Sequence, residues 1–210
     1  MVNEDRVLDR PDICLWAVAD GMGGHSLGDV AAETAIAHLS AIDAPVTPRA
    51  LDVALATANQ VIHEMSGGTS GTTVVMAHID RGIATIRWAG DSRAYLVRND
   101  HLRLLTRDHS VVQELVEAGM LESDQVNAHP QANVITRAVG IEPQSTLESR
   151  SVALDPADRV LLCSDGLSRS LDERDLLGRP ALEALADRLL AGALERDGSD
   201  NISLVLVDVS

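Results

Sequence analysis

Apolar residues along the chain occur in two kinds of run, which predict strands and helices. Short apolar runs, often β-branched and bounded by Gly, Asp and Asn, indicate strands, whereas Ala and Leu at helical spacing indicate helices. The predicted strands are residues 13–19, 73–79, 83–88, 94–97, 159–163 and 202–207. The predicted helices are residues 29–39, 48–65, 111–118 and 180–194.

Two short polar stretches between predicted strands indicate tight turns. Residues 80–82 separate one pair of strands and Asn99-Asp100 follows the next strand, so the middle of the chain is predicted to be an antiparallel meander. Strands clustered in sequence with helices elsewhere indicate an α+β layered fold, not a regular βαβ alternation. Neither repeats nor a long linker interrupt the 210 residues, so we expect one domain.

Composition narrows the classes of partner. The formal net charge is -15 and the chain has no Phe, two Trp and one Tyr, which argues against a nucleic-acid partner. The sequence has no apolar run long enough to span a membrane and no basic, apolar leader at its start, so we expect a cytoplasmic protein with no membrane partner. Cys14 and Cys163 lie in apolar runs and are predicted to be buried.

Aspartates recur at the ends of predicted strands. Asp20, Asp91 and Asp165 each follow an apolar run, and Asp200 stands just before the last one. Taken singly, an Asp beside a small residue is typical of a turn. As a set, such strand ends can converge, and clustered carboxylates repel each other unless cations neutralise them. Oxygen ligands suit Mg2+, Mn2+ or Ca2+, and none of the His or Cys residues has the spacing of a zinc site.

Six motifs in order along the chain carry a resemblance to a known family. They are Asn3-Glu4-Asp5, Val18-Ala19-Asp20-Gly21-Met22-Gly23-Gly24-His25, Ser70-Gly71-Thr72-Thr73, Ala89-Gly90-Asp91-Ser92-Arg93, Ser164-Asp165-Gly166-Leu167 and Asp200-Asn201. Together they resemble the metal-dependent (type 2C, PPM) protein phosphatases, and the Asp-Gly-Met-Gly-Gly-His form resembles the bacterial branch. The resemblance implies an α-β-β-α sandwich of two antiparallel sheets flanked by helices. It also implies one catalytic domain over residues 1–210, with its opening strand missing, and a flap over residues 111–136.

The resemblance also implies a site for two Mg2+ or Mn2+ ions. Asp20 would bridge both ions, Glu4 and the backbone carbonyl of Gly21 would complete one site, and Asp165 with Asp200 would complete the other. Asp20, Asp165 and Asp200 are therefore the predicted catalytic residues.

Further residues are expected around the two ions. Asp5 matches an acid that holds a metal-bound water, and His25 is expected to close a loop beside the site. Asp91, with Asp165, matches ligands of a third and weaker ion. Arg169 stands where many members carry an acid that helps to bind that ion, so the sequence does not decide whether a third ion binds.

The implied function is removal of phosphate from phosphoserine or phosphothreonine by attack of a metal-bridging water. Expected substrates are phosphorylated proteins, targets of a Ser/Thr kinase in bacterial signalling, and we expect a monomer. Family members carry a phosphate-binding Arg before the Asn-Glu-Asp motif, which this sequence lacks. Two alternatives therefore stay open: a catalytically impaired pseudophosphatase that binds a phosphoprotein or kinase, and a two-metal hydrolase for another phosphoester.

Overall fold

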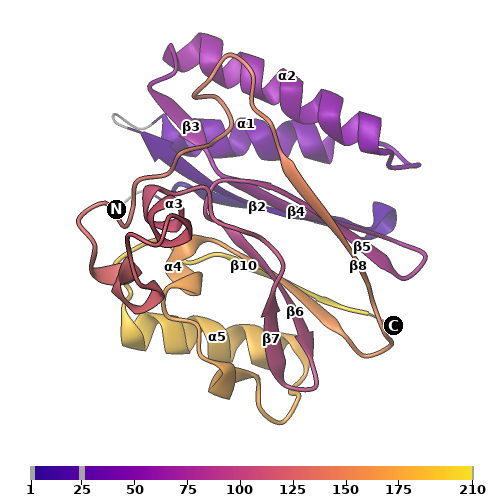
Figure 1. The fold of residues 1–210 in the computed structure, drawn as a ribbon. Coiled ribbons are helices and arrows are strands. Elements are labelled where there is room, and N and C mark those ends of the chain that lie inside the picture. Colours follow the sequence, from indigo (N-terminus) through magenta and orange to yellow (C-terminus); the bar gives the residue numbers. More distant parts are fainter. Residues whose placement is uncertain (1–2, 24–26, 210) are drawn as a thin grey trace.

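Two antiparallel β-sheets stacked face to face, with helices on both outer faces, form the protein in a computed structural model that describes residues 3–23 and 27–209. In Figure 1, α1 and α2 cover one outer face and α5 covers the other. The layers run helix, sheet, sheet, helix, which confirms the predicted α+β class and the predicted sandwich.

The first sheet contains the first five strands of the chain and β8. Its order is β1-β2-β4-β5-β8, and β3 pairs with the end of β2. The strands are β1 (Asp5–Arg10), β2 (Leu15–Gly23), β3 (Ser70–Thr72), β4 (Val74–Asp80), β5 (Ile83–Ala89) and β8 (Glu148–Ala153). Arg81 and Gly82, with φ values of 47° and 73°, form the predicted turn between β4 and β5.

The second sheet has the order β10-β9-β6-β7. Its strands are β6 (Arg93–Arg98), β7 (His101–Leu104), β9 (Arg159–Cys163) and β10 (Leu204–Asp208). Asn99 and Asp100 form the predicted tight turn between β6 and β7. The predicted continuous meander is wrong at one point, because β5 and β6 belong to different sheets and residues 90–92 cross between them.

The helices are α1 (Gly28–Ser40), α2 (Pro48–Ser66), α3 (Val111–Glu117), α4 (Asp165–Ser168) and α5 (Leu182–Arg196), with short 3-10 turns at Pro11–Ile13, Ser123–Ala128 and Glu173–Leu176. Thr47 Oγ1 accepts the backbone N–H of Ala50 at 3.1 Å to cap α2, and Gly67 ends that helix at φ 62°. No helix within residues 3–23 and 27–209 combines the length and the apolar character that a bilayer crossing needs.

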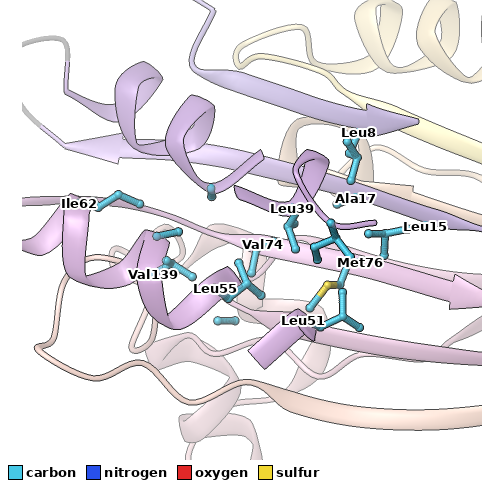
Figure 2. Packing of buried hydrophobic residues seen from close by; sticks show 14 of the residues in the cluster. Leu8, Leu15, Ala17, Leu39, Leu51, Leu55, Ile62, Val74, Met76 and Val139 are labelled. Carbon is cyan, nitrogen blue, oxygen red and sulfur yellow. The ribbon is translucent and has the colours of Figure 1, made fainter. Parts of the chain in front are cut away.

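The core has three apolar layers because the central strands are buried on both faces. In β2, Leu15 and Ala17 face the helices α1 and α2, whereas Trp16 and Val18 face the second sheet. Figure 2 shows the first of these layers, with Leu39 of α1 and Leu55 of α2 packed against the strand residues. Strands covered on both sides read as continuous apolar runs, which is why their positions were predictable.

The two cysteines differ in burial. Cys163 is fully buried in β9, as predicted, in the layer beneath α5. Cys14 is exposed, which contradicts the prediction, because the 3-10 turn Pro11–Ile13 ends there and the residue adopts a left-handed conformation with φ 52°. The apolar run thus begins as a turn, and the strand starts only at Leu15.

Candidate active site

The two ends of the chain meet where the predicted metal ligands lie. The backbone N–H of Glu4 donates to Asn201 Oδ1 at 2.9 Å, and the backbone N–H of Gly21 donates to the carbonyl of Glu4 at 3.2 Å. Gly21 must be small, because a Cβ there would lie 2.1 Å from the carbonyl oxygen of Gly28. Glu4, Gly21 and the Asp200-Asn201 turn are therefore held at one end of the sandwich.

A buried hydroxyl joins the second sheet to this end. Ser164, which is fully buried, donates from Oγ to Asp5 Oδ2 at 2.9 Å and accepts the backbone N–H of Ser203 at 3.0 Å. Gly166, next to Asp165, packs so closely that a Cβ would lie 2.1 Å from the carbonyl oxygen of Asn201. These contacts place the Asp165 loop beside Asp5 and the C-terminal turn.

Threonines of the Ser70-Gly71-Thr72-Thr73 motif hold Asp20 and Asp91 near each other. Asp20 is paired through its backbone, because the N–H of Thr73 donates to its carbonyl at 2.8 Å and Thr72 Oγ1 donates to the same oxygen at 3.0 Å. Thr73 Oγ1 lies 2.7 Å from Ser92 Oγ. This contact fixes the crossover between the sheets, where Asp91 sits.

His109 supports the same crossover from behind. Its Nδ1 accepts the backbone N–H of Gly90 at 3.1 Å, and its ring stacks on Trp88 with ring centroids 6.2 Å apart. Burial lowers the pKa of His109, against the opposing effect of Glu148, whose Oε1 lies 3.1 Å from Nε2. The structure thus agrees with a structural role for this histidine.

The carboxylates interact strongly with one another. Burial raises the pKa of Asp20 to about 9, and the negative charges of Asp165, Asp5, Asp91 and Asp200 add to that shift. Burial, followed by the charge of Asp165, raises the pKa of Asp91 to about 7. Residues from five separate parts of the sequence therefore share one electrostatic environment, in which they cannot all be ionised without cations.

The acid of the N-terminal motif belongs to the same group. Burial raises the pKa of Glu4, and the charges of Asp29, Asp200 and Asp5 raise it further. Asp29, in the first turn of α1, is a neighbour that the sequence did not single out. Its only signal was its position shortly after the Asp-Gly-Met-Gly-Gly-His motif.

The donor set fits hard divalent cations. Asp5 Oδ1 and Asp165 Oδ1 are buried and have no hydrogen-bond partner among residues 3–23 and 27–209, and a buried carboxylate oxygen is stable only when it is paired. In the described part of the chain, no three His, Cys, Asp or Glu side chains are already closed around a single ion position. The fold thus brings together carboxylate oxygens of the kind that bind hard cations. One of them, Asp165 Oδ2, pairs with Arg169.

A cavity of about 620 Å³ opens beside these acids. Asp91, Asp165 and Arg169 line one wall, and Val112, Val126 and Asn133 of the predicted flap line another. Hydrogen bonds fix both ends of the flap region, from the N–H of Val111 to the carbonyl of Val134 at 2.9 Å and from the N–H of Thr136 to the carbonyl of His109 at 2.7 Å.

Most of the predicted site residues lie together. The structure brings Glu4, Asp5, Asp20, Gly21, Asp91, Asp165 and Asp200 to one end of the sandwich. His25 lies outside the described residues. The anchoring roles of Asn201 and Ser164 were not recognised from the sequence, although both residues stand within the quoted motifs.

Comparison with known proteins gives close matches over the whole chain. Serine/threonine phosphatase stp of Listeria innocua is 36% identical over 208 residues, which covers 91% of this chain and 82% of that protein. The structure of PppA, a key regulatory component of T6SS in Pseudomonas aeruginosa, has a TM-score of 0.88 and 38% identity, and the match covers 99% of this chain and 91% of PppA.

A third match was solved with metal. The catalytic domain of the serine threonine protein phosphatase PstP, in complex with 2 manganese ions, matches with a TM-score of 0.84 and 34% identity over 99% of this chain and 91% of that one. The sequence profile of protein phosphatase 2C matches residues 1–203. With the sandwich, the ordered motifs and the gathered carboxylates, these matches show that the chain belongs to the protein phosphatase 2C family.

Proposed function

We propose that this protein is a metal-dependent phosphatase that removes phosphate from phosphoserine or phosphothreonine in proteins. The observation that carries the proposal is the convergence of Asp20, Asp165 and Asp200, whose charges act on one another from distant parts of the sequence. The names of relatives such as stp and PstP support the class of substrate, since they are serine/threonine phosphatases.

Two divalent ions, Mg2+ or Mn2+, would be held by the acids at this end of the sandwich. We assign Asp20 to both ions, Glu4 and the carbonyl of Gly21 to one, and Asp165 with Asp200 to the other. Such a pair of ions supplies a nucleophile at neutral pH and positive charge for the phosphoryl oxygens. PstP with 2 manganese ions supports this number of ions.

Hydrogen bonds within the chain fix the positions of Asp5 and Asp20. Asp5 is 5% exposed, and because Ser164 occupies its Oδ2, its Oδ1 is left to orient a water molecule. Thr73 fixes Asp20 through the backbone. Asp91 and Asp165 line the cavity, and its polar wall would suit a phosphorylated peptide.

The experiment compares activity with and without metal. EDTA-stripped protein should hydrolyse p-nitrophenyl phosphate and a phosphothreonine peptide only after Mn2+ or Mg2+ is added. Asp20→Asn and Asp165→Asn should each lower kcat/KM at least about 100-fold, which is about 2.7 kcal/mol, and should keep the circular dichroism of the wild type. The control Asp187→Asn changes an exposed acid on α5 and should leave the rate unchanged.

Two outcomes would overturn the proposal. A full rate in EDTA would exclude the two-ion reaction, and wild-type protein that binds a phosphopeptide without turnover would be the pseudophosphatase instead. The gathered acids argue against the pseudophosphatase, because a binding module has no use for carboxylates that repel each other. A preference for nucleotides or other phosphoesters over the phosphopeptide would show instead a two-metal hydrolase for another phosphoester.

A further inference from the structure

Arg169 lines the cavity together with Asp91 and Asp165. It follows α4, where its backbone N–H donates to the carbonyl of Asp165 at 3.0 Å, and its guanidinium Nη2 pairs with Asp165 Oδ2. The side chains of Arg169 and Asp165 are only 25% and 14% exposed. The guanidinium is therefore fixed beside the carboxylate and partly shielded from solvent, where an ion pair is screened less than at the surface.

The same guanidinium also acts on Asp91. Asp91 is 8% exposed and lines the same cavity as Arg169. Burial and the charge of Asp165 raise the pKa of Asp91, and the positive charge of Arg169 opposes that shift. The guanidinium thus pairs with Asp165 and, at longer range, offsets the negative charge of Asp91.

The other arginines of the cavity wall are bound to different acids. Arg93 Nη2 lies 2.6 Å from Asp108 Oδ2, and Arg93 Nε donates to Asp108 Oδ1 at 2.9 Å. Arg196 pairs with Asp175 at 2.5 Å and donates to the carbonyl of Ser170 at 2.6 Å. Among the arginines that line the cavity, Arg169 is the one paired with Asp165.

We propose, on the basis of the proposed function, that Arg169 is a built-in counter-ion that replaces a third divalent ion between Asp91 and Asp165. Its guanidinium covers Asp165 Oδ2 and leaves the buried Oδ1 for an ion shared with Asp20. A divalent ion placed against Asp91 would meet the positive charge of Arg169, which repels it. The chain therefore binds two ions, and Asp91 is not a metal ligand.

The number of ions bound tests this directly. Mn2+ titrated into EDTA-stripped, dialysed protein, followed by calorimetry and by the electron paramagnetic resonance of free Mn2+, should show two ions per wild-type chain. Arg169→Asp removes the charge and adds a ligand, so it should bind a third ion. The double variant Arg169→Asp, Asp91→Asn should return to two ions, which locates the third ion at Asp91.

Matched variants keep the test decisive. Arg196→Gln removes an arginine from the same cavity and should still bind two ions. If Arg169→Asp does not fold by circular dichroism, Arg169→Gln replaces it and should also bind a third ion. Three ions in the wild type, or two ions in both folded Arg169 variants, would overturn the inference while leaving the proposed function intact. A wild type that binds no Mn2+ would overturn both.

Discussion

Asn201 Oδ1 accepts the backbone N–H of Glu4 at 2.9 Å, although 197 residues separate the two in sequence. Asn201 also packs its carbonyl oxygen against Gly166, beside Asp165. Through its side chain and its backbone, Asn201 thus connects three groups of predicted ligands: the N-terminal motif, the loop after β9 and the turn before β10. The position of Glu4 relative to Asp165 depends on this residue.

Replacing Asn201 with Ala should loosen the metal site more than it destabilises the fold. A lost neutral hydrogen bond costs about 0.5–1.5 kcal/mol of unfolding free energy, whereas residues that orient metal ligands affect affinity by about 10–100-fold. We expect a Mn2+ affinity reduced within that range, measured by calorimetry. Gln60→Ala, which removes an exposed amide from α2, is the control. An unchanged Mn2+ affinity in Asn201→Ala would show that Glu4 is held by other contacts.

Ser164→Ala should destabilise the protein itself. The hydroxyl is fully buried, and its removal leaves Asp5 Oδ2 and the N–H of Ser203 without their partner. Unsatisfied buried groups cost about 1–3 kcal/mol each, so a loss of at least about 2 kcal/mol is expected in urea unfolding. Ser151→Ala, on an exposed position of β8, should change the free energy by less than about 0.5 kcal/mol. Equal effects of the two substitutions would contradict the role assigned to Ser164.

The sequence predicted the central strands well and the edge strands poorly, for a physical reason. Strand β9 was predicted with its observed bounds, because it is buried on both faces and every residue after Arg159 is apolar. Strands β1, β7 and β8 were not predicted. Each lies at the edge of a sheet and carries many charged or exposed residues, so no apolar run or strict alternation marks it.

The candidate site was predictable as a set of residues but not as a geometry. Asp20, Asp91 and Asp165 each follow an apolar run, which the local pattern reveals. The crossing of the chain between sheets at residues 90–92 was missed, since β5 and β6 look alike in sequence whether or not they pair. The pairing of Arg169 with Asp165 is an i,i+4 contact across α4, and it was missed because no helix was predicted there.

The pH dependence of stability should reveal the gathered acids. Asp20 has a pKa raised to about 9 in the folded protein, above its unfolded value of about 3.9. The protonated Asp20 carboxyl therefore favours the folded state fully at pH values below the unfolded pKa. This contribution to the free energy of unfolding is lost as pH rises toward 9. In EDTA, Asp20→Asn, which cannot ionise, should be as stable as the wild type near pH 4 and roughly 1–3 kcal/mol more stable at pH 8, since one pKa unit is about 1.4 kcal/mol.

Thermal unfolding with circular dichroism detection measures this difference. A gain of 1 kcal/mol corresponds to about 2–4 °C for a chain of this size. Saturating Mn2+ should stabilise the wild type at pH 8 and reverse the order of the two proteins. The same pH dependence in both proteins without metal would mean that Asp20 is not held in the raised-pKa environment.

Gly90 should be intolerant of any side chain, because it sits where the chain crosses between the sheets. Its φ is +111°, and a Cβ there would lie 2.6 Å from Thr73 Cβ. Gly90→Ala must therefore move the threonine that pairs with Ser92 and with the backbone of Asp20, so we expect a loss of at least about 3 kcal/mol of unfolding free energy and a clear fall in kcat/KM. Gly119→Ala is the matched control, since Gly119 also has a positive φ, +67°, but has nothing within 4 Å of the added Cβ. It should cost only about 1–2 kcal/mol from backbone strain. Similar losses in the two variants would show that backbone conformation alone, and not the contact with Thr73, determines the cost at the crossover.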